Sequence, residues 1–217
     1  MINILLRIAV LIIGYFFGIF QTGYLYGKTQ GIDIREHGSG NSGTTNTLRT
    51  LGFKAGLITF LGDFLKAVLA VALVHYAFAG IWEGSIKVLE MYAGFGCVLG
   101  HNFPFYLKFK GGKGIACTVG VACAVFPWAV PVCIVSFLII VGITRYVSLG
   151  SIVMVILFLI QVILYNALGW ITIEPSWMIV EFDLVAACFT VMAIWKHRSN
   201  IVRLAKGTEN KLGQKAK

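Results

Sequence analysis

Residues 115–144 read IACTVGVACAVFPWAVPVCIVSFLIIVGIT, and the way this apolar stretch crosses a membrane decides the fold. As one helix it would be about 45 Å long at about 1.5 Å per residue, whereas a hydrocarbon core is about 30 Å thick. Pro127 and Pro131 flank its middle, and proline there removes a helical hydrogen bond and clashes with the preceding turn. The stretch is therefore predicted to form two short helices joined by a tight turn near Pro127.

Five other apolar runs surround this stretch, at residues 4–26, 55–79, 88–103, 147–168 and 178–195. The chain is 58% hydrophobic and 12% charged, with a mean hydropathy of +0.85, whereas a soluble domain is about 25% charged. The sequence predicts an all-α integral membrane protein, a polytopic bundle of seven transmembrane helices. The segments outside the runs are short, so residues 1–217 are expected to form a single domain.

Basic residues gather in alternate loops. With seven spans, most of the 18 lysines and arginines fall on one side. They are Lys28, Arg35, Arg49, Lys54, Lys108, Lys110, Lys113, Arg145, Lys196, Arg198, Arg203, Lys206, Lys211, Lys215 and Lys217. Because positive loops stay cytoplasmic, the N-terminus is predicted outside and the C-terminus inside. The net charge of +9 then faces anionic headgroups and solutes, and no nucleic-acid-binding motif accompanies it.

Residues 35–46, REHGSGNSGTTN, form a glycine-rich segment beyond the first apolar run. Glycine lets the backbone approach a ligand closely, and successive N–H groups can surround phosphate oxygens. Hydroxyl and amide side chains add neutral donors, and an arginine can fork onto two oxygens. The candidate residues are Gly38, Ser39, Gly40, Asn41, Gly43, Thr45, Asn46 and Arg49. The alternative is a flexible polar loop or a helix cap.

A second basic segment, LKFKGGKG, occupies residues 107–114. Its candidates for phosphate neutralisation or contact are Lys108, Lys110, Gly111, Gly112 and Lys113. It is not a Walker loop, because no strand precedes it and no serine or threonine follows the last lysine. The alternative without a binding role is a positively charged anchor on the cytoplasmic side. His101 lies six residues before this segment and is expected to be structural.

Two further groups carry charge or hydrogen-bonding capacity. Asp63 and Lys66 are three residues apart in one span and share a helix face; Lys66 is predicted to face the substrate with Asp63 holding it, the alternative being a helix-orienting ion pair. His197 and Asn200 lie about one turn apart beyond the last run and could bond one ligand together. Arg198 and Glu209 accompany them, and an interfacial basic helix is the alternative here.

The sequence gives little support for a metal or cofactor. Its acidic residues are few and dispersed, and its cysteines, which all lie in apolar runs, show no metal-binding spacing. No cofactor is expected.

Four segments together resemble the bacterial acyl-phosphate-dependent glycerol-3-phosphate acyltransferases. They are GSGNSGTTN at 38–46, GDFLK at 62–66, HNFPFYLKFKGGKGIA at 101–116 and HRSNIVRLAKGTE at 197–209. The order matches that family, as does the seven-span layout with an external N-terminus. Ser42, Thr44, Tyr106 and Ala67 are minor departures from its pattern, and none removes a group assigned to chemistry.

The resemblance implies that the 1-hydroxyl of glycerol 3-phosphate attacks the carbonyl of a fatty acyl phosphate in the bacterial cytoplasmic (inner) membrane, with the active site facing the cytoplasm. It assigns Ser39, Arg49, His197 and Asn200 to glycerol 3-phosphate. The lysines of 108–113 would neutralise phosphate, with Lys110 and Lys113 in catalytic roles. Asn41, Gly43, Thr45, Asn46, Gly111 and Gly112 would shape the acyl-phosphate pocket. Arg198 would contact substrate, and Glu209 would be structural.

The sequence counts against two other acyltransfer mechanisms. The residues five past His37, His75, His101 and His197 are Ser42, Gly80, Tyr106 and Val202, so the HxxxxD spacing of the other glycerolipid acyltransferases is absent. A Gly-x-Ser-x-Gly nucleophile elbow is also absent. An anion transporter and a purely structural membrane subunit are the alternatives from other classes; the former is expected to show internal repeats.

Overall fold

The computed structural model describes residues 2–214, with side chains from residue 4, so Lys215 and Lys217 lie outside the described residues. The described chain is all-helical, as predicted. Its α-helices are α1 (Ile2–Gly18), α2 (Thr22–Thr29), α3 (Thr44–Leu51), α4 (Phe53–Phe78), α5 (Ile86–Asn102), α6 (Ile115–Val125), α7 (Val130–Thr144), α8 (Val147–Ala167), α9 (Met178–Lys196) and α10 (Arg198–Ala205). Short 3-10 turns occupy Ile34–Glu36, Phe105–Leu107 and Pro127–Ala129.

The break predicted near Pro127 is confirmed. Helix α6 ends at Val125, the turn Pro127–Ala129 follows, and α7 begins at Val130. Within the described residues, five helical segments are long and apolar enough to cross a membrane by length and composition. They are Ile4–Thr29, Phe53–Phe78, Pro127–Thr144, Val147–Ala167 and Met178–Lys196. Ile115–Val125 is a shorter apolar helix.

The first apolar run is interrupted, which its hydropathy did not predict. Helix α1 ends at Gly18 and α2 begins at Thr22. Three carbonyl oxygens at the break bond to side chains. Gly18 O accepts from Gln21 Nε2 at 3.3 Å, Ile19 O accepts from Tyr106 Oη at 2.8 Å, and Phe20 O accepts from Lys66 Nζ at 2.5 Å. These bonds satisfy backbone groups that a continuous helix would have paired internally.

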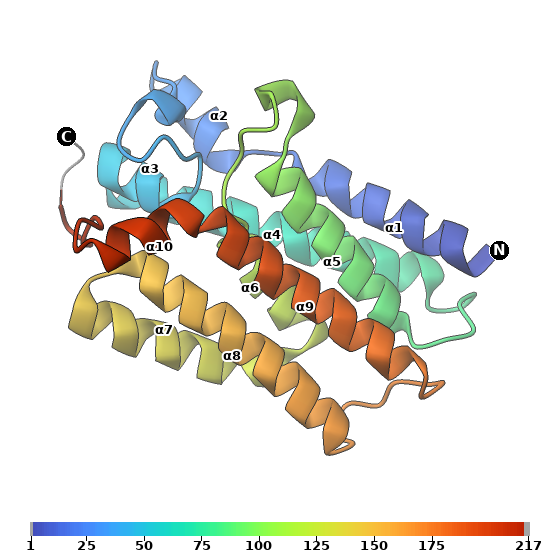
Figure 1. Cartoon of the computed structure of the whole chain (residues 1–217). Helices are drawn as coiled ribbons and strands as arrows, with labels where there is room; N and C mark the ends of the chain where they lie inside the picture. Colours follow the sequence, from blue (N-terminus) through green and yellow to red (C-terminus); the bar gives the residue numbers. More distant parts are fainter. Residues whose placement is uncertain (1, 215–217) are drawn as a thin grey trace.

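Helices α1 and α5 cross in close contact (Figure 1). A Cβ on Gly14 or Gly18 would overlap backbone atoms of α5, and a Cβ on Gly96 or Gly100 would overlap backbone atoms of α1. Small residues spaced four apart on both helices therefore let the two backbones pack directly, which is the usual device for joining helices in lipid.

Two contacts between ionisable side chains join helices within the bundle. Arg7 of α1 is bonded to Glu181 of α9, with Arg7 Nη2 lying 2.7 Å from Glu181 Oε2. His75 of α4 lies 2.6 Å from Glu90 of α5. Ionisable groups in a membrane are costly unless paired, so these contacts join helices as well as satisfy the charges.

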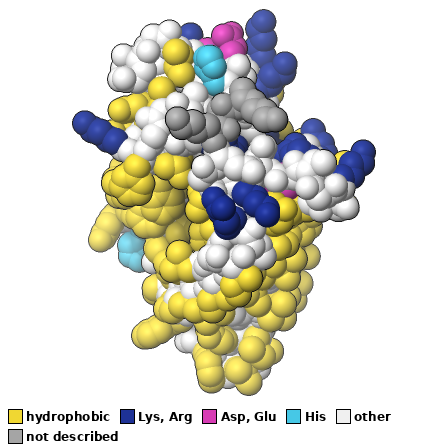
Figure 2. All heavy atoms as spheres, turned by 90° about the vertical axis from the view of Figure 1, so that its left-hand side faces the viewer, with side chains coloured by type: hydrophobic (Ala, Val, Ile, Leu, Met, Phe, Trp, Pro, Cys, Tyr) yellow, Lys and Arg dark blue, Asp and Glu magenta, His cyan; other side chains and the backbone are white. Residues whose placement is uncertain are grey.

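The polar segments lie at one end of the bundle. The start of α1 lies at the opposite end from α3 and α10 (Figure 1). Seen from the side where α2, α3 and α10 lie, lysine and arginine side chains occupy the upper half of the molecule, and hydrophobic side chains cover the lower part (Figure 2). This end is where the predicted anion-binding segments meet.

Candidate active site

A cleft of about 390 Å³ opens between α3, α4, α7, α8, α10 and the loops that join them. Many of the predicted residues line it. They are Ser39, Asn41, Gly43, Thr45, Asn46, Arg49, Asp63, His101, Lys113, His197, Asn200 and Glu209. Four segments far apart in the sequence therefore contribute to one polar cavity.

The side chain of Asn46 holds the first glycine segment in shape. Its Nδ2 donates to the carbonyl oxygens of Ile34, His37 and Asn41 at 3.0, 3.0 and 2.9 Å. Its Oδ1 accepts from Ser39 N at 2.8 Å. Gly38 has a φ of +60°, and a Cβ there would overlap Asn46 Oδ1, so the turn requires glycine. Asn46 thus places Ser39 at the cleft.

A second network surrounds Glu209 and joins the tail to the lysine segment. Lys113 Nζ donates to Asn200 Oδ1 at 2.5 Å, and Asn200 Nδ2 donates to Glu209 Oε1 at 2.7 Å. Arg203 Nε donates to Glu209 Oε2 at 2.7 Å, and Ser148 Oγ donates to Glu209 Oε1 at 3.1 Å. Because Glu209 accepts from all three neighbours, it fixes Asn200 and, through Asn200, Lys113.

Burial controls the charge of the cleft. Burial lowers the pKa of Lys113 to about 8, with the nearby guanidinium of Arg203 adding to the effect and the Glu209 carboxylate opposing it. Burial also lowers the pKa of Arg49 from its usual value. Both groups remain cationic at neutral pH, since an arginine stays protonated well above it. The cleft therefore offers two desolvated cations to an anion.

His197 presents a neutral ring. Burial, reinforced by the cation of Lys113, lowers the pKa of His197 to about 4. Nδ1 lies 2.7 Å from Ala193 O, so Nδ1 carries the hydrogen and donates to that carbonyl. Nε2 is then the acceptor atom of the ring, suited to receiving a hydrogen bond from a substrate hydroxyl.

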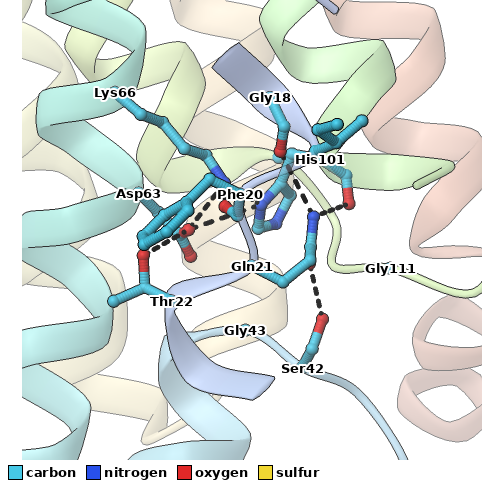
Figure 3. Close-up of polar contacts among 12 residues, drawn as sticks. Gly18, Phe20, Gln21, Thr22, Ser42, Gly43, Asp63, Lys66, His101 and Gly111 are labelled. Carbon is cyan, nitrogen blue, oxygen red and sulfur yellow. Dashed lines mark hydrogen bonds and ion pairs between the residues drawn. The ribbon is translucent and has the colours of Figure 1, made fainter. Parts of the chain in front are cut away.

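Asp63, Lys66 and His101 form a buried group (Figure 3), of which Asp63 and His101 reach the cleft lining. Lys66 Nζ lies 2.8 Å from Asp63 Oδ1 and 2.9 Å from His101 Nδ1, in addition to its bond with Phe20 O. Lys66 does not line the cleft. Its three partners are protein groups, so its geometry matches the helix-orienting alternative rather than the predicted substrate contact.

Several other predicted residues lie outside the cleft lining. Lys108 and Lys110 are exposed on the turn after α5, and Arg198 stacks on Trp195, with its Cζ 4.4 Å from the ring centroid. Gly38, Gly40, Gly111 and Gly112 also do not line it. Gly112 packs against the His101 ring so closely that a Cβ would overlap Nε2. Close packing therefore requires glycine at this position.

The cleft is also lined by Ser148, Ser151 and Asn210, which were not predicted from the sequence. Ser148 and Ser151 lie one turn apart at the start of α8, directly after the basic residue Arg145. Polar residues one turn apart at the charged end of a span were the available signal. Asn210 carries no such pattern.

One wall of the cleft is apolar. It includes Phe60 of α4, Ile115 of α6, and Phe137, Leu138 and Val141 of α7. A cavity that has cations and amides at one side and aliphatic and aromatic groups at the other suits an amphiphile with an anionic head and a hydrocarbon chain.

A sequence profile described as glycerol-3-phosphate acyltransferase matches residues 8–207. The chain is 42% identical to the glycerol-3-phosphate acyltransferase of Clostridioides difficile (strain 630), over 96% of each protein. It is 43% identical to that of Alkaliphilus metalliredigens (strain QYMF), over 99% of this chain and 98% of the relative.

The fold is similar to crystal structures of PlsY, an integral membrane glycerol 3-phosphate acyltransferase. The glycerol 3-phosphate form aligns with a TM-score of 0.80 and 32% identity, over 95% of this chain and 96% of the other. The lysophosphatidic acid form aligns with a TM-score of 0.78 and 31% identity, over 95% of each.

Proposed function

The chain belongs to the glycerol-3-phosphate acyltransferase family, and on that premise we propose that its acyl donor is a fatty acyl phosphate. The reaction transfers the acyl group to the 1-hydroxyl of glycerol 3-phosphate and releases inorganic phosphate. The product is 1-acyl-glycerol 3-phosphate, in the first acylation of phospholipid synthesis.

One observation carries this proposal: Arg49, Lys113 and Asn200 come from three distant segments and line one cleft that continues into an apolar wall. Both proposed substrates carry phosphate, so two anions have to be held together beside a hydrocarbon chain. The desolvated cations of the cleft supply that stabilisation, because charges interact more strongly away from water.

The chemistry fits an acyl phosphate because phosphate is a good leaving group, which removes the need for a strong protein acid. The 1-hydroxyl oxygen bonds to the acyl carbon, the bond from that carbon to the phosphate oxygen breaks, and the hydroxyl proton passes to a phosphate oxygen. In this mechanism the protein acts mainly by positioning the reactants and neutralising charge.

We assign Ser39, Arg49, His197 and Asn200 to glycerol 3-phosphate. Lys113 is the lysine of its segment that lines the cleft, so we assign it to the phosphate that leaves. We assign Asn41, Gly43, Thr45, Asn46, Gly111 and Gly112 to the acyl-phosphate site, and the acyl chain lies against the apolar wall.

We further propose seven membrane crossings within one domain, formed by the α1–α2 pair, α4, α5, α6, α7, α8 and α9. The N-terminus is then outside, and the cleft faces the cytoplasm from the inner membrane. The supporting observation is that the basic side chains gather at the end of the bundle that carries the cleft (Figure 2).

The test is turnover by detergent-purified protein given acyl phosphate and glycerol 3-phosphate, with acyl-CoA in a parallel reaction. We expect equal amounts of inorganic phosphate and lysophosphatidic acid from the first reaction and no acylation from the second. Acylation from acyl-CoA alone would reject the proposed donor. Uptake of glycerol 3-phosphate into vesicles without acylation would instead support an anion transporter, and neither activity a structural subunit.

A further inference from the structure

Gln21 lies at the break between α1 and α2 and is almost completely buried, with 1% of its surface exposed. A buried amide is costly unless its hydrogen bonds are made. Gln21 Nε2 donates to His101 O at 3.0 Å and to Gly18 O at 3.3 Å, and its Oε1 accepts from Ser42 Oγ at 2.9 Å (Figure 3). One side chain thus bonds to three separate segments.

The bond to His101 reaches the lysine segment. The carbonyl oxygen of His101 also accepts from Gly112 N at 3.0 Å, so Gln21 and Gly112 share one acceptor, as a carbonyl with two lone pairs allows. Gly112 directly precedes Lys113. Displacing the His101 carbonyl would therefore displace the turn that carries Lys113 into the cleft.

The bond to Ser42 reaches the first glycine segment. Ser42 is buried and lies next to Gly43, which is the N-cap residue of α3 and lines the cleft. Among the described residues, a direct hydrogen bond also joins the two segments, from Asn41 Nδ2 to Gly111 O. Its length of 3.4 Å is beyond the usual range for such a bond. Gln21 is the better-placed connection between them.

We propose that Gln21 is a positioning residue that fixes the spacing between the glycine segment at 38–46 and the turn that carries Lys113. This rests on the proposed function, in which these two segments hold the anionic groups of the reacting substrates. A loosened spacing lowers the rate of transfer more than it weakens binding of either substrate, because a displacement of about 1 Å can cost roughly 100-fold in rate.

Three variants separate the bonds. Gln21→Met removes both ends of the bridge at similar size. Gln21→Glu keeps an acceptor for Ser42 but loses the donors and places carboxylate oxygens against two carbonyls. Ser42→Ala removes only the Ser42 bond and is the mildest change. The matched control is Gln30→Met, at an exposed glutamine of the same region whose side chain bonds only to Thr29 at 3.4 Å.

We expect both Gln21 variants to lower kcat by about tenfold or more, and Ser42→Ala by about threefold or more, with KM for glycerol 3-phosphate changed less than about twofold. Gln30→Met should match the wild type. Hydrogen exchange should show faster exchange of the Gly111 and Gly112 amides in the Gln21 variants.

The proposal is overturned if kcat is unchanged in Ser42→Ala and in whichever Gln21 variants fold, or if KM rises while kcat is kept. Unchanged exchange at Gly111 and Gly112 would overturn it as well. Because the exchange measurement needs no turnover, it decides the role of Gln21 even if wild-type protein does not use acyl phosphate. That result would reject the proposed donor separately.

Discussion

Lys113 is the residue at which burial and function are most closely linked. The side chain is partly buried, and this burial, with the charges of Arg203 and Arg49 adding to it, lowers the pKa of Lys113 to about 8. If it neutralises phosphate, it has to be protonated, and the protonated fraction falls as pH rises through that pKa. In the free enzyme we therefore expect kcat/KM to fall above about pH 8.

The variant Lys113→Arg should remove this fall, because an arginine stays protonated at these pH values. The measurement is kcat/KM between pH 6 and 10, corrected for spontaneous hydrolysis of acyl phosphate. Lys113→Ala should lose about 100-fold or more in kcat/KM, whereas Lys108→Ala, at an exposed lysine of the same segment, should stay close to wild type. If kcat/KM of Lys113→Arg fell at the same alkaline pH, the titrating group would be one other than Lys113.

At the residue scale, sequence patterns identified much of the cleft lining but not how each side chain is used. The sequence gives Lys108, Lys110 and Lys113 similar charge and spacing. In the structure the backbone turns through left-handed conformations at Lys108 and Phe109, with φ values of 53° and 59°, and Lys113 lines the cleft whereas Lys108 and Lys110 are exposed. Gln21 has no motif at all. Its role depends on the contact with His101, a tertiary contact between residues far apart in the sequence.

At the element scale, the α1–α5 crossing depends on four glycines whose backbones are in contact. A valine at Gly18 would overlap the backbone of α5 at Cys97 and Gly100, so the two helices would have to separate. We expect Gly18→Val to lower the free energy of unfolding by about 1–3 kcal/mol, the usual cost of overpacking. The measurement is thermal or denaturant unfolding in detergent.

The matched control is Gly142→Ala in α7, where an added Cβ meets no atom within 4 Å. It should leave the free energy of unfolding unchanged or raise it by up to about 1 kcal/mol, because alanine favours a helix over glycine. A Gly18→Val protein as stable as the control would show that α1 and α5 are not packed backbone to backbone.

Helix boundaries differ in how far the sequence determines them. The α6–α7 break was predictable because proline acts locally on the backbone. The α1–α2 break has no proline. Its free carbonyls are satisfied by the side chains of Gln21, Lys66 and Tyr106. Long-range partners of this kind do not show in a hydropathy pattern, so residues 4–26 resembled one continuous span.

At the scale of the whole molecule, the proposed topology places the α4–α5 loop outside and α10 inside. Glu83 in the α4–α5 loop and Lys206 directly after α10 are exposed, so each can be replaced by cysteine. In intact cells, a membrane-impermeant maleimide should label Glu83→Cys directly and Lys206→Cys only after permeabilisation, with wild-type protein as the background. Labelling of Lys206→Cys from outside would reverse the orientation.

The central claim is that segments far apart in the sequence act on one ligand in one cleft, and a double-mutant cycle on kcat/KM tests it most directly. Arg49→Lys and Asn200→Ala should each lose about tenfold or more. Because both side chains act on glycerol 3-phosphate, the double variant should lose at least about fivefold less than the product of the single losses, a coupling of about 1 kcal/mol. Losses that simply multiply, or single variants as active as wild type, would contradict a shared site.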